Sequence, residues 1–248
     1  MFELIHLLTL LVGVFSGVIG GISGAGGGLI VSPYMILIGL PPSVAVSTPK
    51  LAGIGVGTGS LIRFFKSGSI DWYWAKRLLL VTVIFGTLGS YALIWLPESF
   101  IKIFALGLSV VIVLQFIGSK NIGLKRVEPT RNRRIAGYVV YSIVETIRGA
   151  IGSGIGTINM MVMMSNFGLP AINASATKRF VTYPALLTGL IILGVNGFID
   201  WRHGLMLLLG TGVGGYFGAI LAIDKGNLFV RRILVFVVMA LVLSVIAL

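Results

Sequence analysis

The chain contains no cysteine and few charged residues of either sign. Without cysteine it can form neither a disulfide nor a thiolate metal site, and the redox state of its compartment is not readable from the sequence. Charged residues make up 10% of the 248 positions, whereas a soluble domain has roughly a quarter. A water-soluble globule is therefore the least favoured class.

The scarcity of histidine argues against an intramembrane enzyme. Nucleophilic catalysis needs a positioned base, and both His6 and His203 fall at the ends of apolar segments. The sequence has no His-Glu motif of the metalloprotease type, and its glycine cluster at 24–28 lacks the lysine of a phosphate-binding loop. We therefore expect no catalytic residues, no metal and no cofactor.

Apolar residues dominate what is present. They make up 56% of the chain, the mean hydropathy is +1.05, and several runs approach the ~20 residues that cross a bilayer. The first run lacks a basic start and a cleavage site, so we expect it to remain as a helix. The net charge of +12 is explained by basic cytoplasmic loops, so the expected partner is the lipid bilayer and not nucleic acid.

Glycine and proline divide the chain into ten apolar segments. Two of them, 28–40 and 155–168, have about 13 residues, or roughly 20 Å of helix, which is too short to cross a bilayer alone. Each of the two follows a glycine cluster and ends at a Gly-Leu-Pro sequence. The segments are 3–22, 28–40, 43–65, 77–96, 99–118, 135–152, 155–168, 171–195, 203–222 and 229–247.

The two halves of the chain resemble each other. A shift of 129 residues aligns about 20 identities without a gap. The aligned motifs include Gly-Leu-Pro at 39–41 and 168–170 and Ile-Asp-Trp at 70–72 and 199–201. We interpret the pattern as a first transmembrane repeat, a basic linker and a second transmembrane repeat. Their bounds are 1–119, 120–134 and 135–248.

Loop charges predict the topology. The linker carries six basic residues against Glu128, which predicts a cytoplasmic position. Five crossings per copy place Lys225, Arg231 and Arg232 on the same side, whereas four crossings with re-entrant short segments would expose them outside. We therefore predict an all-α polytopic membrane protein of about ten segments in two inverted five-helix repeats. It would lie in the cell membrane with both termini outside, and a homodimer is left open.

Cations occur deep within the predicted spans. Lys50 and Arg179 each lie nine residues beyond the Gly-Leu-Pro of their repeat, about 13 Å into the bilayer. In an inverted repeat both depths end near the midplane, where the two cations would face a shared cavity. A buried charge costs at least ~2.5–3.5 kcal/mol, so it needs a partner or a function, unless it snorkels to the interface. We predict a substrate site that also includes the adjacent Thr48, Thr177 and Lys178.

The glycine clusters mark the points where the first helix of each repeat should break. A broken helix presents free backbone N–H groups and a positive dipole end to an anion. Close packing of crossing helices is the structural alternative. The predicted contributors are Gly26, Gly27, Gly28, Gly154 and Gly156, together with Asn159, which follows the second break.

Glu145 is the one carboxylate predicted near mid-depth. Arg148 lies three residues later on the same helix face, so the two form either a structural ion pair or a coupling site in which Glu145 carries a proton. A cation transporter that uses Glu145 is a further alternative. By contrast, the Asp-Trp pairs at 71–72 and 200–201 are typical of interfacial anchors, with the carboxylate in water.

These motifs together resemble the sulfite exporter TauE/SafE family. The resemblance rests on the glycine run, on Gly-Leu-Pro-Pro-Ser-Val-Ala-Val-Ser-Thr at 39–48, on Gly-Ser-Ile-Asp-Trp at 68–72, and on the weaker second copies at 168–170 and 199–201. It spans nearly the whole chain. It implies a permease that moves sulfite, sulfonates or related anions, mostly outward and coupled to the electrochemical gradient.

The basic residues after Thr48 and Thr177 depart from the Ser-Leu-like apolar continuation of many members. Pro49-Lys50 and Lys178-Arg179 stand there instead, which favours a more highly charged anion. A passive anion channel and proton-coupled or cation-coupled uptake of another small organic anion remain alternatives to export.

Overall fold

The computed structural model describes residues 2–24, 28–95, 122–151 and 155–246. Within these ranges every regular element is a helix, which confirms the predicted all-α class. The helices are α1 (Phe2–Ser23), α2 (Gly28–Leu37), α3 (Pro42–Ser47), α4 (Pro49–Lys66), α5 (Trp72–Trp95), α7 (Arg131–Ile151), α8 (Gly156–Ser165), α9 (Ala171–Val195) and α10 (Trp201–Ile246).

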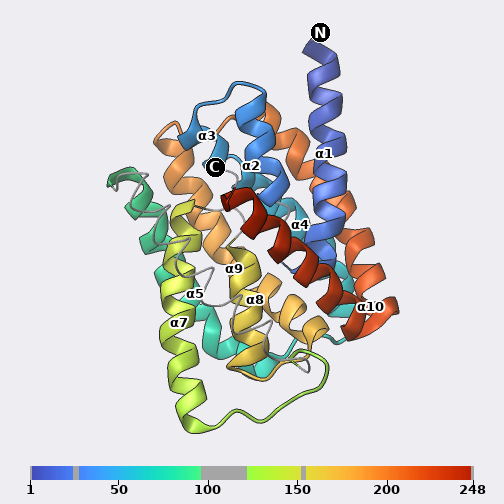
Figure 1. Ribbon diagram of the computed structural model, residues 1–248. Helices are drawn as coiled ribbons and strands as arrows, with labels where there is room; N and C mark the ends of the chain where they lie inside the picture. Colours follow the sequence, from blue (N-terminus) through green and yellow to red (C-terminus); the bar gives the residue numbers. More distant parts are fainter. Residues whose placement is uncertain (1, 25–27, 96–121, 152–154, 247–248) are drawn as a thin grey trace.

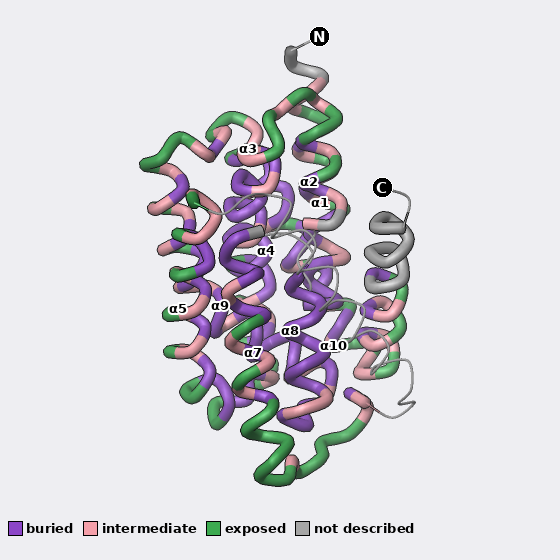
Figure 2. Tube along the Cα trace, turned by 60° about the vertical axis from the view of Figure 1, so that its left-hand side comes forward, coloured by how far each residue is buried: buried purple, intermediate pink, exposed green. Residues whose placement is uncertain are grey.

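Apolar side chains cover the outside of the bundle. On α5 the exposed residues Leu80, Ile84 and Leu88 recur every four positions and form one continuous outer stripe. In contrast, α8 is buried along nearly its whole length, and Figure 2 shows the same for much of α4 and α9. An apolar exterior around an interior that holds charged groups is the arrangement expected of a protein surrounded by lipid.

Four described helices are long and apolar enough to cross a membrane. In α4 the 18 residues include Lys50, Arg63 and Lys66, and α7 is more highly charged still, so neither reaches the same apolar character. The described residues therefore do not establish the predicted ten spans, and the predicted segment 99–118 lies outside them. The four spans are Ile5–Ser23, Trp72–Trp95, Ala171–Val195 and Trp201–Val237.

Two helical stretches are interrupted, one before a proline and one at a glycine. The expected helix 43–65 is divided into α3 and α4 at Thr48, because Pro49 has no N–H to continue the helical ladder. The expected helices 203–222 and 229–247 are both present as the two parts of α10, because the helical backbone is interrupted at Gly226, between them. The backbone of Gly226 has φ 81° and ψ 179°, a conformation that glycine adopts without steric cost.

The predicted short helices are present. Each of α2 and α8 has 10 residues, or about 15 Å of helix. The preceding helices α1 and α7 end at Ser23 and Ile151, next to the two glycine clusters. This confirms that each first helix stops at its glycine cluster and that a short second helix follows.

Helices pack across the two halves of the chain. α1 lies along α10, and its counterpart α7 lies along α5, which is the counterpart of the first half of α10. A Cβ at Gly89 would lie 3.0 Å from the backbone nitrogen of Ala150. At the equivalent crossing, a Cβ at Gly218 would lie 3.0 Å from the Cα of Gly21. Two crossings 129 residues apart in sequence therefore use the same close backbone contact.

The two ends of the bundle differ in what covers them. In Figure 1 the described part of the linker, residues 122–130, runs across the end opposite the N-terminus. The Val127 N–H donates to the carbonyl of Gly168, and the Ala171 N–H donates to the carbonyl of Gly123, so this segment is fixed to the α8–α9 turn. We call this the linker end, and the other the N-terminal end.

Candidate functional site

Five charged side chains are buried in the middle of the bundle. Four are cations and one is a carboxylate, which leaves a formal excess of three positive charges. The only other buried acid among the described residues, Asp71, is paired with Arg126 at the linker end. Because the desolvation of a charge is costly, each cation requires a compensating group. The five are Lys50, Glu145, Arg148, Lys178 and Arg179.

Glu145 and Arg148 form an ion pair on α7. The Nε and Nη2 atoms of Arg148 each lie 2.7 Å from Oε2 of Glu145, so the contact is a two-nitrogen clamp on one oxygen. The other carboxylate oxygen, Oε1, accepts a 2.5 Å hydrogen bond from Nδ2 of Asn159 on α8. A Cβ at Gly86 of α5 would lie 3.1 Å from Nη2 of Arg148, so this glycine leaves room for the pair.

Lys50 and Arg179 bind backbone carbonyls in a reciprocal manner. The Lys50 ammonium in the first half of the chain donates a 2.7 Å hydrogen bond to the Gly149 carbonyl in the second half. The Arg179 guanidinium in the second half donates to the carbonyl of Gly20, the counterpart of Gly149 at an offset of 129 residues. Each cation thus satisfies a carbonyl near the C-terminus of α7 or α1, where helical partners run out and the dipole favours positive charge.

Lys178 and Arg148 connect these groups into one cluster. Lys178 donates to the carbonyl of Gly24, just beyond the end of α1. The Arg148 charge is close enough to repel both Lys50 and Lys178, and Glu145 is close enough to attract Lys178. The structure therefore brings all five buried charges into electrostatic contact, although none of the three cations outside the ion pair has a carboxylate of its own among the described residues.

Gly189 packs closely against Lys50 and Ser90. A Cβ at Gly189 of α9 would be 3.4 Å from Nζ of Lys50 and 2.7 Å from Oγ of Ser90, which shares the Gly149 carbonyl with Lys50. Sequence reasoning missed Ser90, Gly149 and Gly189. A serine in an apolar helix and a backbone carbonyl carry no distinctive sequence signal, so their convergence becomes visible only in three dimensions.

Thr48 and Thr177 lie at opposite ends of the bundle. The Asp71 N–H donates a 2.9 Å hydrogen bond to Oγ1 of Thr177, and the Asp200 N–H donates a 3.0 Å hydrogen bond to Oγ1 of Thr48. Both hydroxyls therefore accept from the residue that precedes α5 or α10. The structure places them beside these turns and does not bring them together at the Lys50 ammonium.

The expected water-exposed carboxylate at Asp71 is wrong. Its side chain is only 4% exposed, because Oδ2 pairs at 2.8 Å with Nη2 of Arg126 and Oδ1 caps the N–H of Trp74. At the other end the Asp200 side chain is 26% exposed and accepts from the His203 N–H. The difference arises because the linker folds over Asp71.

The glycines of the predicted site are only partly described. Gly28 and Gly156 are the first residues of α2 and α8, where backbone N–H groups have no helical acceptor. Gly26, Gly27 and Gly154 lie outside the described residues. Near the first break, a Cβ at Gly24 would meet Oγ of Ser175, a buried hydroxyl that forms no hydrogen bond within the described ranges.

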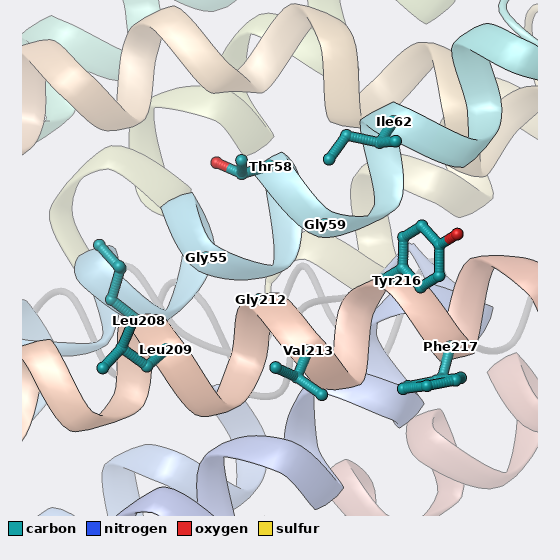
Figure 3. Close-up of a pocket in the computed structure, with 10 residues that line it drawn as sticks. All are labelled: Gly55, Thr58, Gly59, Ile62, Leu208, Leu209, Gly212, Val213, Tyr216 and Phe217. Carbon is teal, nitrogen blue, oxygen red and sulfur yellow. The ribbon is translucent and has the colours of Figure 1, made fainter.

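A separate groove opens on the apolar exterior between α4 and α10. Its volume is about 440 Å³, and glycines such as Gly59 and Gly212 leave the space while Leu209, Val213 and Phe217 line it (Figure 3). It contains no charged side chain. An anion would lose its hydration there without compensation, so the groove is not a substrate site. In the described part of the chain, no group of three or more histidine, cysteine or acidic side chains could hold a metal ion.

Comparisons with known proteins cover close to the whole chain. Residues 9–245 match a family described as Sulfite exporter TauE/SafE. The chain is 25% identical to a probable membrane transporter protein of a Sinorhizobium species, over 98% of this chain and 93% of that protein. It is also 24% identical to the probable membrane transporter protein YfcA of Escherichia coli K12, over 91% of this chain and 84% of YfcA.

Proposed function

Since the chain belongs to the sulfite exporter TauE/SafE family, we propose that it exports a small sulfur oxyanion or organosulfonate across the cell membrane. The related proteins carry the name probable membrane transporter protein. The observation that carries the substrate class is the formal excess of three buried positive charges around Lys50, Lys178 and Arg179. A bound anion would offset the desolvation of these cations, which carbonyl dipoles do only in part.

The proposed site is the space between the two helix breaks. Lys50, Lys178 and Arg179 would supply charge, the first turns of α2 and α8 would supply backbone N–H groups, and Asn159 would orient the anion. Ser90 and Gly189 are added to this site because they border the Lys50 ammonium. Thr48 and Thr177 would act indirectly, by fixing the turns that precede α10 and α5.

Alternating access is the proposed mechanism, with ten segments in two inverted repeats. Support comes from paired contacts at an offset of 129 residues: Lys50 to Gly149 with Arg179 to Gly20, and Thr48 to Asp200 with Thr177 to Asp71. In this topology the linker is cytoplasmic and both termini are outside. A negative-inside potential then favours export by about 2.3 kcal/mol per charge per 100 mV.

Flux measurements on purified protein in liposomes test the proposal. With sulfite, thiosulfate or isethionate loaded inside, we expect saturable flux that is stimulated by exchange and by a potential negative on the cytoplasmic face. Accumulation that requires a proton or cation gradient would instead establish coupled uptake. Conductance far above carrier turnover would establish a channel.

Charge-removing variants test the site. Lys50→Gln and Arg179→Gln retain a hydrogen-bond donor but lose the charge, so we expect anion affinity to fall about tenfold or more in folded protein. Lys66→Gln, at the exposed end of the same helix as Lys50, is the matched control. Unchanged affinity in both buried-site variants would remove these residues from the site.

A further inference from the structure

A polar pocket of about 270 Å³ opens at the linker end, away from the buried charges. Arg126 and Glu128 of the linker, Arg134 of α7, Tyr73 of α5 and Phe167 of the α8–α9 turn contribute to its wall. We call it the vestibule. Its volume is ample for an oxyanion of a few heavy atoms, although it is smaller than a typical drug-sized pocket.

The vestibule is basic and remains accessible. Arg126 uses Nη2 to pair with Asp71, yet its side chain is still 57% exposed. Arg134 is exposed as well, and the Arg77 guanidinium lies 3.6 Å from the centroid of the Tyr73 ring at the rim. A concave surface with an excess of guanidinium groups raises the local concentration of anions.

Aromatic side chains separate the vestibule from the buried charges. Phe167 lines the vestibule and packs against Trp74, Tyr138 and Tyr141, with ring centroids 4.5, 5.4 and 6.1 Å away. We call these four residues the aromatic plug. Phe167 and Tyr141 are completely or almost completely buried, so no solvent path passes between them in this conformation.

The inner surface of the plug reaches the site itself. The Tyr141 hydroxyl lies 2.9 Å from Oγ1 of Thr82 on α5 and also contacts Glu145. Glu145 in turn holds Arg148 and Asn159. A continuous series of contacts thus runs from the exposed guanidinium groups, through the plug, to the buried ion pair.

The opposite end of the bundle has no equivalent plug at the matching positions. The counterparts of Phe167, Trp74 and Tyr141 at an offset of 129 residues are Ile38, His203 and Val12. All three are only half-buried. The plug is therefore a feature of the linker end and is not imposed by the repeat.

We propose that the vestibule is the site where an oxyanion or sulfonate first binds at the linker end, and that Phe167 is the gate between it and the buried cations. The inference rests on the proposed transport function, in which this end is cytoplasmic. Arg126 and Arg134 concentrate the anion, and displacement of the Phe167 ring from Trp74 and Tyr141 opens the path to Arg148. Because Phe167 lies in the α8–α9 turn, its ring moves when this turn moves.

Cysteine accessibility tests the vestibule, because the native chain has no thiol. Val127→Cys places a thiol on the vestibule wall. In vesicles of known orientation we expect modification only from the linker end. The anionic sulfonatoethyl methanethiosulfonate should react about tenfold faster than the cationic trimethylammonioethyl reagent, after correction for free-thiol rates. Arg126→Gln with Arg134→Gln should abolish this preference, whereas Arg202→Gln, at the other end, should not.

A second thiol tests the gate. Thr82→Cys lies directly behind Tyr141 and should resist both reagents from the linker end, whereas adding Phe167→Ala should raise its rate of modification about tenfold or more. Phe167→Leu should raise the modification rate of Thr82→Cys by an intermediate amount. It replaces Phe167→Ala in the test if the alanine variant does not fold. Ile38→Ala is the matched control and should leave the rate unchanged.

The outcomes separate this inference from the proposed function. Equal anion and cation rates at position 127, or rapid modification of Thr82→Cys with the plug intact, would overturn the inference even if transport is measured. The expected labelling without any flux of sulfur anions would overturn the transport function but retain an anion-selective vestibule behind an aromatic gate.

Discussion

The Lys50 ammonium donates a 2.7 Å hydrogen bond to the carbonyl of Gly149, which is 99 residues away in sequence. The equivalent residues of the other half, Arg179 and Gly20, make the equivalent contact. Each half of the chain therefore supplies the cation that satisfies the end of the first helix of the other half. A change that separates the two halves would remove both contacts, so the buried charges couple the position of one half to that of the other.

Loss of one turn contact should destabilise the protein. Thr177→Val leaves the buried Asp71 N–H without its acceptor, which costs about 1–3 kcal/mol. Thr48→Val should cost less, because the N–H of Asp200 is only partly buried. Thermal unfolding of purified protein in detergent measures both, and Thr177→Ser retains the acceptor as the control. Equal melting temperatures for Thr177→Val and Thr177→Ser would contradict this expectation.

The glycine crossings should not tolerate a methyl group. In Gly89→Ala the new Cβ would overlap the Thr146 carbonyl and come within 3.0 Å of the Ala150 nitrogen, so α5 and α7 would have to separate. We expect a loss of about 1–3 kcal/mol or more. Gly212→Ala is the control, because its nearest neighbour would be 3.6 Å away, an ordinary contact. Equal melting temperatures for the two variants would show that the close crossing of α5 and α7 is not required for stability.

Glu145→Gln should be more damaging than Arg148→Gln. The first removes the only carboxylate from the buried cluster and leaves Arg148 unpaired, which costs about 3–5 kcal/mol. The second leaves Glu145 near Lys178, which still attracts it. The double variant should be less destabilised than the sum of the single ones, as a thermal double-mutant cycle would measure.

Exposed Glu128→Gln controls for a general effect of charge on the melting temperature. If Arg148→Gln proved the more destabilising of the two single variants, Lys178 would not be acting as a second partner of Glu145.

The proposed inverted topology predicts opposite labelling of matched positions. Ser67 and Asn196 are counterparts at an offset of 129 residues, and both are exposed. Single variants Ser67→Cys and Asn196→Cys, treated with an impermeant maleimide in oriented vesicles, should react from opposite faces. Labelling after detergent permeabilisation shows that each thiol is reactive. Reaction of both from the same face would require parallel repeats.

Local sequence signals predicted the helices and their interruptions well. Glycine and proline act on the backbone within one or two residues, so the ends of α1 and α7 and the short α2 and α8 could be located in advance. The break at Gly226 also falls between the expected helices 203–222 and 229–247, whereas the division of the expected helix 43–65 at Pro49 was not predicted. Hydropathy measures burial over a whole segment, and it does not resolve where one apolar helix stops and the next begins.

The contacts that buried charged side chains make with distant backbone groups could not be predicted in the same way. The sequence placed Glu145 three residues from Arg148, a spacing that by itself brings two side chains onto one helix face. It did not indicate that the Arg179 guanidinium donates to the Gly20 carbonyl. Every residue has a backbone carbonyl, so the residue type does not show which carbonyl will be the acceptor.

The sequence by itself determined the environment of this protein, its duplicated order of elements and the residues that carry charge into the bilayer. Composition, glycine breaks and a repeated pattern are properties of neighbouring residues, and they are readable without a fold. The tertiary structure alone decided that α1 pairs with α10 and α7 with α5. That exchange brings residues more than 90 positions apart into contact, and it determines which carbonyl each buried cation binds and which aromatic rings separate the vestibule from Glu145.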